Sequence, residues 1–204
     1  EARVVHPPVS IDELSPVPPE QVSNRYLWVS QMTPYKRADV AMEAFNRLGV
    51  PALMVGDGEM YKYVRKHAGP NVEVRQRLSF PELKAAYATA RALVFTPEED
   101  FGIVPVEANA SGRPVIAYGR GGARDSIIEG KTGLFYNDHS VDGLIDAIRR
   151  FEAWEPQFRP EDAVANARRF APEVFQNGIR ASLDYFYSRE IQGASAPLAI
   201  PPGL

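Results

Sequence analysis

Residues 92–117, ALVFTPEEDFGIVPVEANASGRPVIA, decide the fold. The stretch opens on four apolar residues, Ala92 to Phe95, a short run typical of a buried strand. A polar segment follows, then a helix is predicted near Val104 to Ser111, before a second apolar run from Pro114 to Ala117. Two buried strands joined through a helix form the unit from which parallel sheets are built.

The same alternation of apolar run and helical pattern recurs along the chain. Strands are predicted at residues 26–30, 52–55, 72–74, 92–95, 114–117 and 133–135, each followed by a helix near 38–48, 59–66, 79–90, 104–111, 123–129 and 141–151. This pattern predicts an α/β fold of the Rossmann-like type, a doubly wound parallel sheet of about six strands with helices on both faces. Right-handed crossovers then bring the carboxyl ends of the strands to one edge, where ligands of this fold class bind.

The two ends of the chain lie outside this repeat, which we assign to residues 25–159. Residues 1–24 hold five prolines and are predicted to form an initial strand and a proline-rich interdomain linker. Residues 160–187 are predicted to be helical, and residues 188–204 to be a flexible tail. An apolar stripe at helical spacing packs either on this domain or on a surface outside the chain; it comprises Val174, Phe175, Ile179, Leu183 and Phe186.

Composition excludes several classes of protein. Hydrophobic residues make up 45% and charged residues 24%, the balance of a globular domain. A net charge of −3 gives no general attraction to nucleic acid, so we expect no nucleic-acid partner. The sequence has no cysteine, which fits a reducing compartment such as the cytoplasm, and no apolar run long enough to span a membrane. Because the chain begins at Glu1 rather than methionine, we expect it to be part of a longer protein.

Three adjacent acids, Glu98 to Asp100, follow the strand that ends at Phe95. Pro105 is acceptable in a first helical turn, so the next helix is predicted to open near Val104 and leave amides around Gly102 and Ile103 free for an anion. Glu107 then falls about one turn inside the helix, while Glu99 stays on the loop. Both carboxylates are therefore expected to face one cleft.

Simpler interpretations of these acids stay open. The acidic triplet is equally typical of a solvated loop, which its spacing alone favours. Glu107 is also typical of a helix-capping glutamate, although its partner position lacks the Ser or Thr of a capping box.

The spacing of Glu99 and Glu107 within Glu-Asp-Phe-Gly-Ile-Val-Pro-Val-Glu-Ala resembles the motif of family 4 retaining glycosyltransferases of the two-lobed GT-B type. Further matching segments follow in the order expected of the C-terminal lobe of that family, over residues 25–151. They are Tyr26 to Ser30, Pro34 to Arg37, Val55 to Gly58, Gly112 to Ala117, Gly121-Gly122 and Thr132-Gly133.

This resemblance implies a site for a nucleotide-sugar donor. Glu99 is expected to act at the catalytic centre on hydroxyls of the transferred sugar, Glu107 to hold the ribose, and Lys36 to meet the diphosphate. The remaining sugar and diphosphate contacts are expected from Arg37, Phe101, Gly102, Ile103 and Val104, and the nucleoside contacts from Arg77 and Leu78. A fixed ammonium and helix-terminal amides stabilise charge on a leaving diphosphate, so no metal and no cofactor besides the donor substrate is expected.

Some residues depart from the family pattern or are open to a structural explanation. Gln31 stands where relatives often have an arginine, and Asp125 where they usually have a glutamate. Gly56-Asp57-Gly58 is either a tight turn or a close approach to the nucleotide. Gly119 to Gly122 is a weak match to a phosphate loop. His6, His67 and His139 lack the spacing of metal ligands.

The expected function is transfer of a hexosyl group, with retention, to a glycan or lipid-linked acceptor in polysaccharide biosynthesis. The resemblance to bacterial polysaccharide mannosyltransferases favours GDP-mannose as donor. A missing N-terminal lobe is expected to hold the acceptor and to provide any peripheral membrane contact, so this chain alone is expected to be inactive. A nucleotide-sugar epimerase of the same fold and a non-catalytic nucleotide-binding module remain alternatives.

Overall fold

The computed structural model describes residues 3–194 and contains one six-stranded sheet in which every pair of neighbours is parallel. The strands are β1 (Tyr26–Val29), β2 (Ala52–Val55), β3 (Val72–Arg75), β4 (Leu93–Phe95), β5 (Val115–Tyr118) and β6 (Gly133–Tyr136). Their order in space is β3-β2-β1-β4-β5-β6, so the direction of winding reverses between β1 and β4. This is the strand order of a doubly wound dinucleotide-binding sheet.

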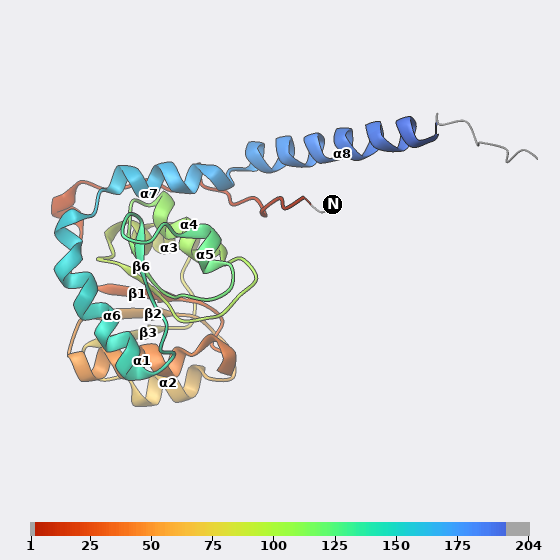
Figure 1. Ribbon diagram of the computed structural model, residues 1–204. Helices are drawn as coiled ribbons and strands as arrows, with labels where there is room; N and C mark the ends of the chain where they lie inside the picture. Colours follow the sequence, from red (N-terminus) through yellow and green to blue (C-terminus); the bar gives the residue numbers. More distant parts are fainter. Residues whose placement is uncertain (1–2, 195–204) are drawn as a thin grey trace, which may run out of the picture.

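Helices cover both faces of the sheet (Figure 1). One face packs against α1 (Ala38–Leu48), α2 (Tyr61–His67) and α6 (Val141–Trp154). The other face packs against α3 (Phe80–Thr89), α4 (Ile103–Ala110) and α5 (Ala123–Ser126). Because both faces are covered, the strands are largely apolar, apart from Glu73 and Arg75 of the edge strand β3. Alternate residues enter different cores, Trp28 with the α1 side and Leu27 with the α3 side. The predicted α/β fold of about six strands is confirmed.

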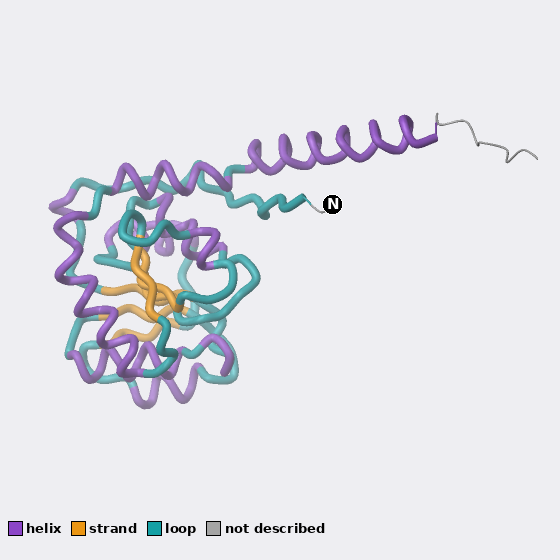
Figure 2. The backbone as a smooth tube through the Cα atoms, in the orientation of Figure 1, coloured by secondary structure: helices purple, strands orange, loops and turns teal. Residues whose placement is uncertain are grey.

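The C-terminal helices continue from α6. A short 3-10 turn (Glu155–Gln157) leads to α7 (Pro160–Ala167), which packs on α4, and a second one (Arg168–Phe170) leads to α8 (Pro172–Ala194). Figure 2 shows α8 leaving the body of the domain. Four of the five residues of its apolar stripe are exposed, with Leu183 at 64% and Phe186 at 44% of their full accessibility, and Phe175 is half-buried. No helix in the described part of the chain is long and apolar enough to cross a membrane.

Four local predictions differ from the structure. Residues 3–24 contain no strand and run as loop with one 3-10 turn at Pro19–Gln21. Proline has no N–H to donate to a neighbouring strand. The segment is instead held by a hydrogen bond from Val9 N–H to Phe170 O (2.8 Å). The α5 helix ends at Ser126 rather than Glu129, since Ile127 is extended and Ile128 N–H donates to Thr132 Oγ1 (2.9 Å). The predicted tail begins too early, because α8 continues to Ala194; residues 195–204 lie outside the described part. The α6 helix runs on to Trp154.

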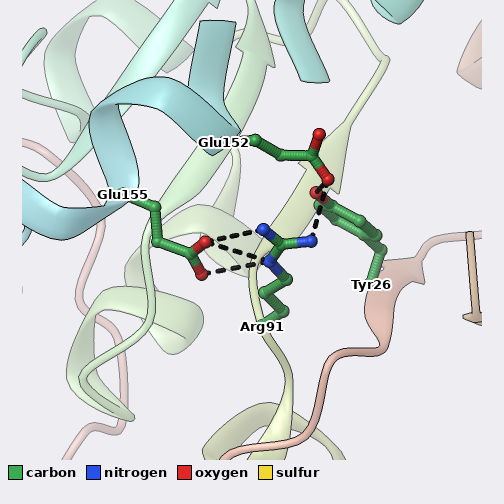
Figure 3. Close-up of polar contacts among 4 residues, drawn as sticks. All are labelled: Tyr26, Arg91, Glu152 and Glu155. Carbon is green, nitrogen blue, oxygen red and sulfur yellow. Dashed lines mark hydrogen bonds and ion pairs between the residues drawn. The ribbon is translucent and has the colours of Figure 1, made fainter. Parts of the chain in front are cut away.

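A polar cluster at the amino ends of the strands holds α6 to the sheet (Figure 3). Arg91, just before β4, donates to both carboxylate oxygens of Glu155 (2.7–3.1 Å) and to Glu152 (2.9 Å). The Tyr26 hydroxyl at the start of β1 also donates to Glu152 (3.2 Å). The hydrogen bonds from Arg91 to Glu155 raise the pKa of the guanidinium, and burial raises the pKa of the Tyr26 hydroxyl. We call these four residues the Arg91 clasp.

Candidate functional site

A pocket of about 680 Å³ opens at the carboxyl edge of the sheet, where the loops after β1 and β4 face each other. The loop after β1 contributes Ser30, Gln31, Tyr35 and Lys36. The segment from the end of β4 into α4 contributes Phe95 and Glu98 to Val104, and Pro7 closes one side. These loops leave the two strands at which winding reverses, which is the position where open α/β sheets bind ligands.

An ion pair joins the two walls of the pocket. Lys36 Nζ contacts Glu99 Oε1, and their side chains are only 13% and 22% exposed. Lys36 ends a 3-10 turn, Pro34–Lys36, which Pro34 helps to start. Arg37 follows in the left-handed region with φ +55° and pairs with Asp39 (3.4 Å), so its side chain is not part of the pocket wall. Of the two predicted phosphate cations, the structure places Lys36 in the pocket and Arg37 beside it.

The amino end of α4 borders the pocket. Gly102 is the N-cap, with φ +85° and no side-chain cap, and the helix begins at Ile103. The backbone conformation favours glycine, and the space is tight, because a Cβ at this position would lie 3.1 Å from the Phe95 ring. Phe101, Ile103 and Val104 line the pocket as well. Uncapped helical amides of this kind bind anions readily.

Glu107 lies on α4 one turn beyond Ile103, outside the pocket wall. The buried Tyr87 hydroxyl of α3 donates to its Oε2 (2.7 Å). Burial raises the pKa of Glu107, and the hydrogen bond from Tyr87 opposes that rise. The structure therefore puts Glu99 and Glu107 on the same helix-and-loop segment but does not put both in one hollow, because Tyr87 holds Glu107 toward α3.

The two predicted nucleoside residues also lie away from the pocket. Arg77 is exposed and faces Asp57 (3.6 Å). Leu78 lines a separate cavity of about 230 Å³ between β3 and α3. The next residue, Ser79, caps α3: Ser79 N–H donates to Glu82 (2.7 Å) in a capping box.

Two glycine-containing turns pack closely against the backbone of the pocket walls. A Cβ on Gly121 would overlap Glu99 O, and one on Gly122 would overlap Phe101 Cα. Gly122 N–H also donates to Glu99 O (2.7 Å). Likewise a Cβ on Gly56 would overlap Ser30 O in the opposite wall. Both turns are thus explained by close backbone packing against the binding loops.

Sequence reasoning assigned no role to several wall residues, namely Pro7, Tyr35 and Glu98. Tyr35 and Glu98 directly adjoin predicted site residues, which is the signal that could have found them. Pro7 gave none, because it comes from a segment about 90 residues away in sequence from the acidic loop.

The histidines occupy separate places. His6 stacks on Phe101 (5.6 Å between ring centroids), His67 contacts Tyr63, and His139 stacks on Tyr118 (3.8 Å). Within the described residues, no group of three or more His, Asp or Glu side chains is placed to hold a metal ion. The expectation of a metal-free site stays a prediction.

Comparison with known proteins identifies one family. The family model described as glycosyl transferases group 1 matches residues 11–170. A D-inositol 3-phosphate glycosyltransferase of Corynebacterium glutamicum is 33% identical over 71% of this chain and 39% of its own length. A GDP-mannose-dependent alpha-(1-6)-phosphatidylinositol monomannoside mannosyltransferase of Mycobacterium tuberculosis is 30% identical over 59% of this chain and 36% of its own length. The chain thus spans less than two fifths of these relatives.

The fold is shared with solved structures. The structure of Anabaena HepE in complex with UDP-glucose superposes with a TM-score of 0.73 at 20% identity, covering 90% of this chain and 57% of that one.

Replacing Gly122 should disrupt the acidic loop. We expect Gly122→Ala to cost about 3 kcal/mol of unfolding free energy or more, because backbone atoms of Asp100 and Phe101 fill the space. Gly130→Ala is the control: φ is +70° but nothing lies within 4 Å, so only strain of about 1–2 kcal/mol is expected. Denaturant unfolding measures both, and equal losses would contradict the packing explanation.

Glu107 should reduce stability at neutral pH. The pKa of Glu107 is raised in the folded state. The wild-type chain therefore loses stability relative to Glu107→Gln as the pH rises from the ordinary pKa of a glutamate through this raised pKa. The variant should therefore unfold at a higher temperature at pH 7, with the difference vanishing in acid. Glu82→Gln should show the opposite sign, because hydrogen bonds from Ser79 lower the pKa of Glu82 and stabilise its charged form above that value. Thermal unfolding between pH 3 and pH 8 tests both; the same sign in both variants would refute the assignment.

Proposed function

The chain belongs to the glycosyl transferases group 1 family, and we propose that it is the nucleotide-sugar donor-binding domain of a retaining hexosyltransferase. The observation that carries this proposal is the meeting of Lys36, Glu99 and the uncapped amino end of α4 around one pocket at the winding reversal. A cation and free amides suit a diphosphate, while a carboxylate suits sugar hydroxyls.

Donor binding requires the Lys36–Glu99 ion pair to open. The Lys36 ammonium then meets the diphosphate together with the amides of Gly102 and Ile103, and Glu99 accepts hydrogen bonds from the sugar. Because Tyr87 occupies Glu107 Oε2, the other oxygen is the acceptor we assign to a ribose hydroxyl. The nucleoside then lies along α4, outside the 680 Å³ pocket, on the side of Arg77 and Leu78.

The proposed chemistry is a metal-free substitution at the anomeric carbon with retained configuration. The bond from this carbon to a diphosphate oxygen breaks, and its electron pair leaves with the diphosphate. The acceptor hydroxyl forms the new bond and gives its proton to an oxygen of the departing diphosphate. Lys36 and the α4 amides stabilise the charge that develops on the leaving group. Glu99 either positions the sugar or acts as a nucleophile, and a trapped glycosyl adduct on Glu99 would establish the second role.

GDP-mannose is the donor we favour, because one relative is a GDP-mannose-dependent mannosyltransferase. The structural neighbour with UDP-glucose keeps the uridine donor as the direct competitor. A role in polysaccharide biosynthesis and a cytoplasmic location remain predictions of the sequence.

Calorimetric titration of the chain with GDP, UDP and ADP tests the donor. We expect GDP to bind most tightly, and Lys36→Met to weaken GDP binding by about tenfold or more through loss of a charged hydrogen bond. Lys62→Met is the control, because Lys62 is exposed on α2 and away from the pocket. Preference for UDP would replace the donor assignment, and equal effects of the two lysine variants would refute the diphosphate site.

Transfer should also need a second lobe that this chain does not include. The chain spans 36–39% of the two relatives compared above, and most of the stripe on α8 is exposed. We expect no sugar transfer by residues 1–204 alone. Joined to an acceptor lobe, the chain should transfer sugar, and Leu183→Ser with Phe186→Ser should lower that activity without changing donor affinity. Transfer by the 204-residue chain, measured by product analysis, would contradict this proposal.

A further inference from the structure

Thr96 connects the two walls of the pocket at their base. It follows β4 directly, is fully buried, and precedes the acidic loop by one residue, Pro97. Its hydroxyl donates to the backbone carbonyl of Lys36 (2.6 Å). The same hydroxyl accepts a hydrogen bond from the Trp28 indole Nε1–H (2.9 Å). A single side chain thus links β1, the Lys36 turn and the acidic loop.

A third hydrogen bond fixes the Thr96 backbone. His139 Nε2 lies 2.8 Å from Thr96 O. Because a carbonyl can only accept, Nε2 carries the proton. The ring is held by stacking on Tyr118, with centroids 3.8 Å apart and planes 7° from parallel. Trp28 is equally fixed, since it is 1% exposed in the core.

These bonds leave Thr96 little freedom. Its one hydroxyl proton is used toward Lys36, and a lone pair is used toward Trp28. The backbone of Lys36 is therefore anchored to the residue that also sets where Glu98 and Glu99 begin. Movement of one wall must strain or break a buried hydrogen bond that the other wall shares.

We propose that Thr96 is a positioning residue that couples the Lys36 turn to the Glu99 loop, so that a nucleoside diphosphate held at the pocket changes the hydrogen bond from Trp28. This inference rests on the proposed function. It explains how the wall that binds the diphosphate and the wall that binds the sugar keep a fixed position relative to each other. Thr96 itself lies below the pocket and does not line it.

The first test needs no ligand. Thr96→Val keeps the shape but removes the hydroxyl, while Thr96→Ser keeps the hydroxyl. The matched control is Thr132→Val, because Thr132 is also fully buried and accepts one hydrogen bond from Ile128 N–H (2.9 Å) away from the pocket. In ¹H–¹⁵N spectra we expect the Trp28 indole signal to shift and exchange faster with water in Thr96→Val only. The Trp154 indole serves as the internal reference. An unmoved Trp28 signal in Thr96→Val would overturn the coupling.

The second test adds GDP and UDP separately. For whichever binds the wild-type chain, we expect the Trp28 indole signal to shift on saturation, although its side chain is buried. Thr96→Val should lose this shift and bind about tenfold more weakly, which is the effect of one lost buried hydrogen bond. Thr96→Ser and Thr132→Val should behave as wild type. Equal affinities for Thr96→Val and Thr132→Val would overturn the proposal.

Two further outcomes keep the tests separate. If neither nucleotide binds the wild-type chain, the proposed function fails, and the ligand-free spectra still decide whether Thr96 couples the walls. If Thr96→Val does not fold, His139→Phe replaces it, because this variant keeps a ring against Tyr118 and removes the donor to Thr96. Weaker nucleotide binding by His139→Phe than by Thr132→Val would support the coupling, and equal binding would overturn it.

Discussion

Right-handed crossovers between parallel strands are the constraint from which the rest of the structure follows. The crossover after β1 places α1 on one face, and the crossover after β4 places α4 on the other. The loops leaving these neighbouring strands must therefore diverge, and the space between them is the pocket. Lys36 comes from one loop and Glu99 from the other, so their ion pair is a direct result of this topology.

The sequence was sufficient to predict the strands because five of them are almost continuous apolar runs bounded by polar turns, and the edge strand β3 alternates apolar with charged residues. Glu98 and Glu99 could also be placed at the carboxyl edge, since residues that follow a parallel strand lie there, whereas Lys36 was assigned to the site only through the family resemblance. The course of residues 3–24 could not be predicted, because prolines define a stiff backbone but not what it packs against. Its packing instead depends on a distant partner, Phe170.

The direction in which a side chain points also could not be predicted from the sequence. Helical spacing placed Glu107 one turn into α4 but could not show that it faces Tyr87, twenty residues earlier. Glycine turns were equally ambiguous, since only the neighbouring backbone shows why Gly122 has no side chain. Thr96 gave no pattern at all, because a buried residue whose hydroxyl bonds to two distant partners and whose carbonyl bonds to a third leaves no periodicity in the sequence.

The Arg91 clasp lies at the amino edge of the sheet, and the binding loops lie at the carboxyl edge. Attachment of α6 and recognition of a ligand thus depend on different residues. A lineage with this architecture can exchange loop residues, and with them its choice of substrate, while the framework stays anchored from below. Because the two edges are separate, the binding loops can change in evolution without loss of the framework. A fold with this property can carry many specificities.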